Sequence, residues 1–84
     1  MYYLISINSR NGKPYFPCGN KGSMRGHYKS PRYIQRQAEA FARASGADKV
    51  YALTEARYTQ RVCELSNDSF CNYVACVGVL MVQA

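Results

Sequence analysis

The sequence has few of the residue types from which active sites are built. Its 84 residues include a single histidine, His27, and no tryptophan. The five acidic residues are scattered and mostly stand beside cations, so no carboxylate pair for acid–base catalysis is indicated. Cys18 and His27 could form a nucleophile–base pair, but no third group is evident that would orient them. We therefore expect a protein that is not an enzyme and needs no cofactor.

Metal-binding and membrane-spanning patterns are also missing. The four cysteines contain no closely spaced pair such as C-x2-C, which a zinc site favours. The longest apolar stretch, Tyr73–Val82, has about half the length that a bilayer-spanning helix needs. The first apolar residues follow Met1 without the charged leader of a signal peptide. We expect a cytoplasmic protein that binds no metal and no membrane, with cysteines that are buried thiols.

Positive charge is what the first half of the chain has in excess. Between Arg10 and Arg43 there are eight basic residues and one acid, Glu39, which gives +7. The remainder has three basic and four acidic residues, or −1, and the whole chain carries +6. Such asymmetry indicates an anionic partner, either a nucleic acid or an acidic protein surface.

The segment Ser30–Gly46 predicts a helix over residues 31–45. Ser30 can accept a hydrogen bond from a first-turn N–H, Pro31 suits the first helical position, and Gly46 suits the left-handed position that follows a helix. The residues with helical spacing that we expect to face a core are Ile34, Ala38, Phe41 and Ser45, with Ala42 beside them.

The outer face of this helix and the loop before it form the candidate binding surface. Residues 19–29 are predicted to be a flexible, basic, glycine-rich loop that leads into the helix N-terminus, where N–H groups favour an anion. Tyrosines beside the cations suit stacking or protein contacts. A solvated surface that binds nothing specific is the alternative interpretation. The candidate binding residues are Lys21, Arg25, His27, Tyr28, Lys29, Arg32, Tyr33, Arg36 and Arg43.

The N-terminal residues predict a β-hairpin. Residues 2–9 are rich in strand formers, and the dipeptide Asn11-Gly12 favours a two-residue type I′ turn that would pair Arg10 with Lys13. Pro14 and Pro17 cannot donate to a sheet ladder, so the second strand should be short and lie at an edge.

The remaining chain predicts an α+β fold. Asp48–Leu53 should form a strand, and Thr54–Leu65 is compatible with a helix or a strand, with the strand slightly favoured by a possible turn at 67–68. Residues 72–82 are apolar on both faces of an extended chain, which predicts a central strand. We expect one domain over residues 1–84, with an antiparallel or mixed sheet of four or five strands and one main helix on one face.

Two functional hypotheses follow from these features. In size and character the chain is similar to phage-encoded anti-defence proteins, including anti-CRISPR proteins, which implies a non-catalytic protein that inhibits a nucleic-acid-handling complex by binding it. Its partner would be an acidic protein surface or a nucleoprotein complex. In the alternative, the chain is a nucleic-acid-binding module that holds DNA or RNA phosphates with little sequence specificity. A homodimer formed through an exposed sheet edge is a third possibility.

Overall fold

The computed structural model describes residues 2–15 and 31–83, in which four antiparallel strands form one sheet. The strands are β1 (Tyr2–Asn8), β2 (Lys13–Tyr15), β3 (Lys49–Thr54) and β4 (Val79–Gln83), in the spatial order β2-β1-β3-β4. The helical elements are α1 (Pro31–Ser45), the 3-10 helix η2 (Glu55–Arg57), α2 (Gln60–Cys63) and α3 (Asn67–Val77). The predicted α+β class, the antiparallel sheet and the helix at 31–45 are confirmed.

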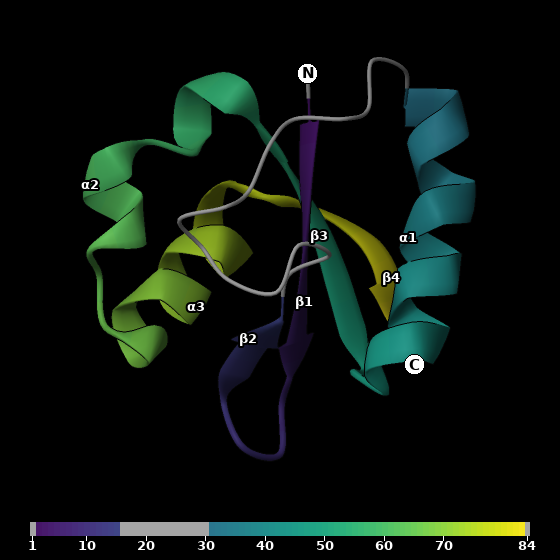
Figure 1. Cartoon of the computed structure of the whole chain (residues 1–84), viewed down its shortest axis with the longest axis horizontal. Coiled ribbons are helices and arrows are strands. Elements are labelled where there is room, and N and C mark those ends of the chain that lie inside the picture. Colours follow the sequence, from purple (N-terminus) through teal and green to yellow (C-terminus); the bar gives the residue numbers. More distant parts are fainter. Residues whose placement is uncertain (1, 16–30, 84) are drawn as a thin grey trace.

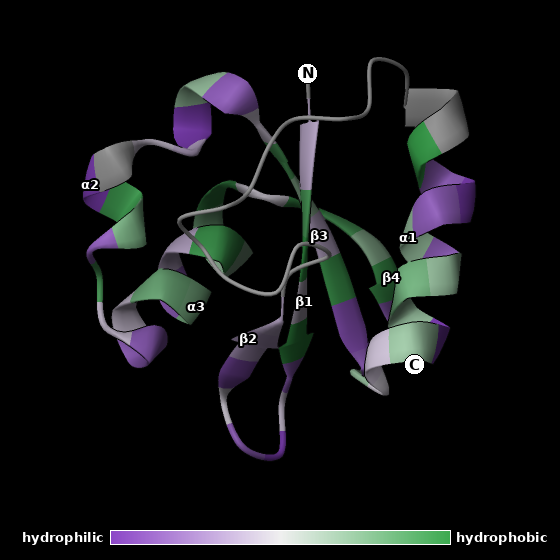
Figure 2. Ribbon diagram, viewed as in Figure 1, coloured by the Kyte–Doolittle hydropathy of each residue, from purple (hydrophilic) through white to green (hydrophobic). Residues whose placement is uncertain are grey.

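Helices cover both faces of the sheet, α1 on one side and α2 with α3 on the other (Figure 1). This arrangement follows from β1 and β3, whose central residues are buried whichever way they point. The face that packs against α1 contains Leu4, Val50 and Ala52, with Ile34 and Ala38 from the helix. The opposite face contains Tyr3, Ile5, Ile7, Tyr51 and Leu53, packed against Tyr58, Val62, Phe70 and Val74. Figure 2 shows apolar residues along these central strands, and polar residues on the β1–β2 turn and on the helices.

The predicted central strand at 72–82 is wrong. Most of that segment belongs to α3, and the strand that follows, β4, lies at the edge of the sheet. Phe70 and Val74 are fully buried at a spacing of four residues, which is the period of a helix face. Ser66 caps the helix, because its side-chain oxygen accepts a hydrogen bond from the Ser69 N–H over 3.3 Å. The expected turn at 67–68 is therefore the first turn of α3.

The slight preference for a strand in Thr54–Leu65 is also wrong. The segment contains η2 and α2, and Thr59 caps α2 by accepting a hydrogen bond from the Val62 N–H over 3.4 Å. Tyr58, which lies between η2 and α2, is buried. Its ring stacks on the ring of Tyr3 in β1 at a centroid distance of 4.5 Å. This ring contact holds the segment against the sheet, and it outweighs the strand propensity of the segment's individual residues.

The hairpin has a longer turn than predicted. Asn8 pairs with Lys13, so residues 9–12 form a four-residue connection instead of a two-residue type I′ turn. The Gly12 N–H donates to the Asn8 carbonyl over 2.8 Å, and Gly12 has a positive φ of 66° that a residue with a side chain rarely adopts. Because β2 has three residues, includes Pro14 and lies at an edge, the prediction of a short edge strand is confirmed.

The other edge strand, β4, contains an irregularity at Met81. Val50 pairs with Val82 and Tyr51 with Leu80, which leaves Met81 as an extra residue between the two pairs. The Met81 carbonyl accepts a hydrogen bond from the Gln35 side-chain amide of α1 over 2.9 Å. The helix thus supplies a donor to the irregular part of the strand.

Among residues 2–15 and 31–83, none of the helices has the length and apolar character that crossing a membrane requires.

Candidate partner-binding surface

The outer face of α1 presents two exposed arginines, Arg36 and Arg43. They lie seven residues apart, close to two helical turns, so both point away from the side where Ile34 and Ala38 are buried. Glu39 lies between them, and its carboxylate accepts a hydrogen bond from the Gln35 side chain over 3.4 Å. Within the described part of the chain, neither arginine has a carboxylate at ion-pairing distance. Two solvated guanidinium groups are therefore available to an anionic ligand.

The structure describes only part of the predicted binding surface. Arg36 and Arg43 share the outer face of α1, as their spacing predicted. The backbone of Arg32 and Tyr33 belongs to the first turn of α1. The remaining predicted binding residues, like the whole predicted loop at 19–29, lie outside the described residues; they are Lys21, Arg25, His27, Tyr28 and Lys29.

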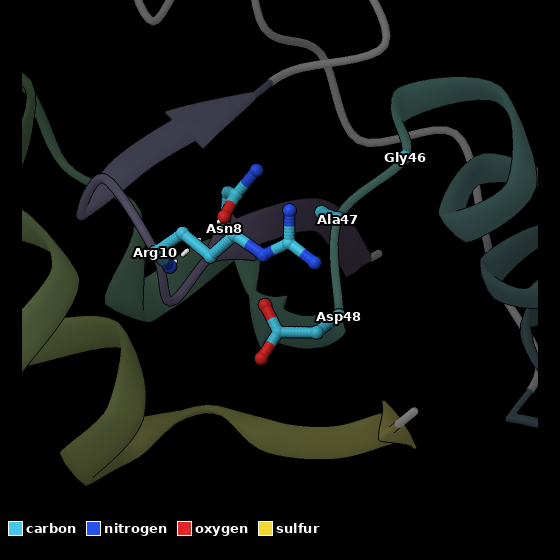
Figure 3. A pocket seen from close by; sticks show the side chains of 5 residues that line it. All are labelled: Asn8, Arg10, Gly46, Ala47 and Asp48. Atoms are coloured by element: carbon cyan, nitrogen blue, oxygen red, sulfur yellow. Dashed lines mark hydrogen bonds between the residues drawn. The ribbon is translucent and has the colours of Figure 1, made fainter.

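A polar hollow of about 280 Å³ lies at the C-terminal end of α1 (Figure 3). Asn8 comes from the end of β1, Arg10 from the β1–β2 turn, and Gly46, Ala47 and Asp48 from the connection between α1 and β3. These segments meet because β1 and β3 are antiparallel neighbours, so the end of one strand lies beside the start of the other. Gly46 has a φ of 69°, which lets the chain leave the helix sharply and turn toward the sheet.

Hydrogen bonds hold the polar groups around this hollow in place. The Asp48 carboxylate accepts from the Ser9 N–H over 2.8 Å, and hydrogen bonds from Ser9 lower the pKa of Asp48 below its ordinary value. The Asn8 side-chain oxygen accepts from the Arg10 N–H over 2.9 Å. Figure 3 shows the Arg10 side chain extending from the turn toward Ala47 and Asp48. The hollow can therefore offer a fixed negative charge and a guanidinium group to a polar ligand.

Sequence reasoning did not select the residues of this hollow as a site. The sequence predicts Arg10 as part of the basic half of the chain and of the hairpin turn, and no sequence pattern groups it with Asn8 and Asp48. The local signal is that Asn8 and Asp48 are short polar residues next to apolar strands, close to loops. The pairing of β1 with β3, which brings them together, joins positions about forty residues apart and has no local signature.

The cysteines depart in part from their predicted burial. Cys63 and Cys71 are half-buried, whereas Cys76 is exposed on α3. The Cys71 thiol donates to the Gly12 carbonyl over 3.3 Å and so ties α3 to the β1–β2 turn. Among the described residues, no three His, Cys, Asp or Glu side chains are placed to hold a metal ion together.

No protein-family model, curated protein or solved structure matches this chain.

Proposed function

We propose that this protein is a small non-catalytic interaction protein that binds and inhibits a partner through the outer face of α1. The observation that carries the proposal is the exposure of Arg36 and Arg43 on one face, neither of them within ion-pairing distance of a carboxylate of the described residues, so that the face keeps a net positive charge beside Glu39. A guanidinium group pairs well with a carboxylate or phosphate, so the surface suits an acidic protein face or a nucleoprotein complex.

The way the sheet is packed supports a surface-binding role. Both sheet faces are buried under helices, so the central strands have no face left for a ligand. An inhibitor of this kind acts by occupying a surface that its partner needs for nucleic acid, as do the phage-encoded anti-defence proteins that the chain resembles in size and character. Its binding energy would come from charge complementarity.

The test compares the wild-type protein with a charge-reversed face and a matched control. The face variant is Arg36→Glu with Arg43→Glu; the control is Arg57→Glu with Arg61→Glu, which makes the same charge change at exposed positions on the other side of the sheet. Each protein is immobilised, exposed to host extract at about 150 mM salt and examined by mass spectrometry for retained partners. We expect a partner that the wild type and the control retain and the face variant loses. Adding the protein to that purified partner should lower its nucleic-acid cleavage or binding in proportion to complex formed.

Nucleic acid itself is the competing ligand, and the same variants separate the two cases. Fluorescence anisotropy with labelled single-stranded DNA and RNA is measured at about 100 mM and 200 mM salt. Tight binding at the lower salt that weakens steeply at the higher salt and is lost in the face variant would make the protein a nucleic-acid-binding module. Retention of one protein partner by all three proteins would refute the proposed surface.

A further inference from the structure

A second hollow is lined by residues of α2, α3 and the segments beside α2. Figure 1 shows α2 and α3 on the opposite side of the sheet from α1. Its volume is about 330 Å³, and its lining residues are Thr59, Arg61, Val62, Leu65 and Tyr73. Known small-molecule sites begin at about this size. The hollow could therefore admit a small ligand, and its lining indicates which chemistry that ligand would have.

Two of the polar lining side chains are already engaged within the fold. The Thr59 hydroxyl oxygen accepts the Val62 N–H over 3.4 Å as the cap of α2. The Tyr73 hydroxyl donates to the Arg57 carbonyl over 2.8 Å, which fastens α3 to η2. What Thr59 and Tyr73 contribute to the hollow is therefore mainly a methyl group and an aromatic ring. With Val62 and Leu65, they make walls that suit a hydrocarbon.

Among the described residues that line the hollow, Arg61 is the charged one. Its side chain is exposed, and within the described part of the chain no carboxylate lies at ion-pairing distance from it. The planar guanidinium group can donate two parallel hydrogen bonds to one carboxylate, and these charge-assisted bonds are about twice as strong as bonds between neutral groups. This lining would thus recognise a ligand that has one anionic group and an apolar body.

We propose that this hollow binds a small apolar monocarboxylate, with its hydrocarbon part against Val62, Leu65 and the Tyr73 ring and its carboxylate paired with Arg61. The site is separate from the outer face of α1, because the sheet lies between them. Its occupation is therefore independent of partner binding by Arg36 and Arg43, and either proposal can fail alone.

Hexanoate is a suitable probe, titrated into the isotopically labelled protein and followed by amide chemical shifts in NMR spectra. We expect saturable shifts centred on Val62 and Leu65, with a dissociation constant of about 1 mM for a ligand with so few atoms. Hexanamide, which has the same chain without the charge, should bind about tenfold more weakly or worse, since it loses the charge-assisted pair. Phenylacetate in a parallel titration tests whether an aromatic body is preferred to an aliphatic one.

Two variants locate the site. Arg61→Gln should weaken hexanoate at least about tenfold, whereas Arg57→Gln, an equally exposed charge loss on the neighbouring η2, should leave binding unchanged. Unchanged far-UV circular dichroism of each variant confirms that the fold persists. The proposal is overturned if hexanoate produces no saturable shifts near α2 and α3, if hexanamide binds equally well, or if the two variants have the same effect.

Discussion

Gly78 marks the point where α3 ends and β4 begins, and replacing it with alanine should destabilise the fold through lack of space. A Cβ atom there would lie 2.5 Å from the Val74 carbonyl oxygen and 3.3 Å from the Tyr51 Cβ. The Val74 carbonyl is held in place, because it accepts the Gly78 N–H over 2.8 Å as the last bond of α3. Tyr51 is held in β3, the strand that pairs with β4. The methyl group would have to displace one of these two neighbours.

The magnitude of the effect follows from two opposing contributions. Inserting a methyl group into a filled site costs about 1–3 kcal/mol. Replacing glycine by alanine recovers about 0.4–1 kcal/mol by restricting the unfolded chain. Gly78 has a φ of −80°, which any residue adopts, so no conformational strain is added. We expect Gly78→Ala to lower the free energy of unfolding by roughly 1–2 kcal/mol, which in a domain of this size lowers Tm by roughly 5–15 °C.

Urea denaturation followed by circular dichroism measures this change, and Gly46 provides the matched control. Gly46 has a φ of 69° and nothing within 4 Å of an added Cβ, so its alanine variant pays a conformational cost and no steric one. Asparagine, which tolerates the left-handed region, should recover part of that cost at Gly46 but be worse than alanine at Gly78. Gly78→Ala that is as stable as the wild type would refute the steric argument.

Three further changes test other contacts of the fold by the same denaturation assay. Gln35→Met should cost about 1–2 kcal/mol, because it leaves the Met81 carbonyl without its 2.9 Å donor. Ser6→Ala should cost about 1 kcal/mol, and a cycle with Ser45→Ala should attribute part of it to the 3.1 Å hydroxyl pair. Burial raises the pKa of Tyr58 above its usual 10.0, so its contribution is complete below about pH 10 and is lost as pH rises further. Unfolding free energy should therefore fall above about pH 10 in the wild type and less in Tyr58→Phe.

The parts of the fold that could be predicted from the sequence are those in which local signals agree. The helix at 31–45 has a proline at its first position, a glycine after its last and an apolar period between them. The short edge strand β2 follows from Pro14, which lacks the N–H that a ladder needs. Neither inference requires knowledge of a distant contact.

The segment 72–82 shows why the rest was not predictable in this way. Its valines and tyrosine favour strands, and an apolar run without alternation fits either a buried strand or a buried helix. Burial of Phe70 and Val74 against the sheet selects the helix, and that burial depends on Ile5 and Leu53, far away in the sequence. The extended backbone of Gly78, with φ −80° and ψ 160°, then separates the helix from β4.

The same distinction applies to the candidate surface. Arg36 and Arg43 could be placed on one face from helical spacing alone, because a helix relates residues that are close in sequence. The hollow that contains Arg10 and Asp48 depends on the pairing of β1 with β3, and the hollow beside Arg61 depends on the docking of α2 near α3. Sites formed by non-local contacts of this kind leave little trace in the order of residues.

The net charges on the two sides of the sheet have opposite signs. The distance between these two sides decides at which salt concentration the binding experiments should be run. Among the side chains that the structure describes, the outer face of α1 has Arg36, Glu39 and Arg43, which sum to +1. The segment 55–68 on the opposite side has two arginines and three acids, which sum to −1.

The molecule measures 29 × 28 × 22 Å, whereas the Debye length is about 8 Å at physiological ionic strength and about 30 Å at 0.01 M. At physiological salt, charges on one side are screened from a ligand on the other, so reversing Arg57 and Arg61 leaves the α1 face unaffected. At 0.01 M salt the same control would alter the field around the whole molecule and weaken binding of any polyanion. The comparison between Arg36 with Arg43 and Arg57 with Arg61 is thus specific to one surface only when the salt concentration is about 0.1 M or higher.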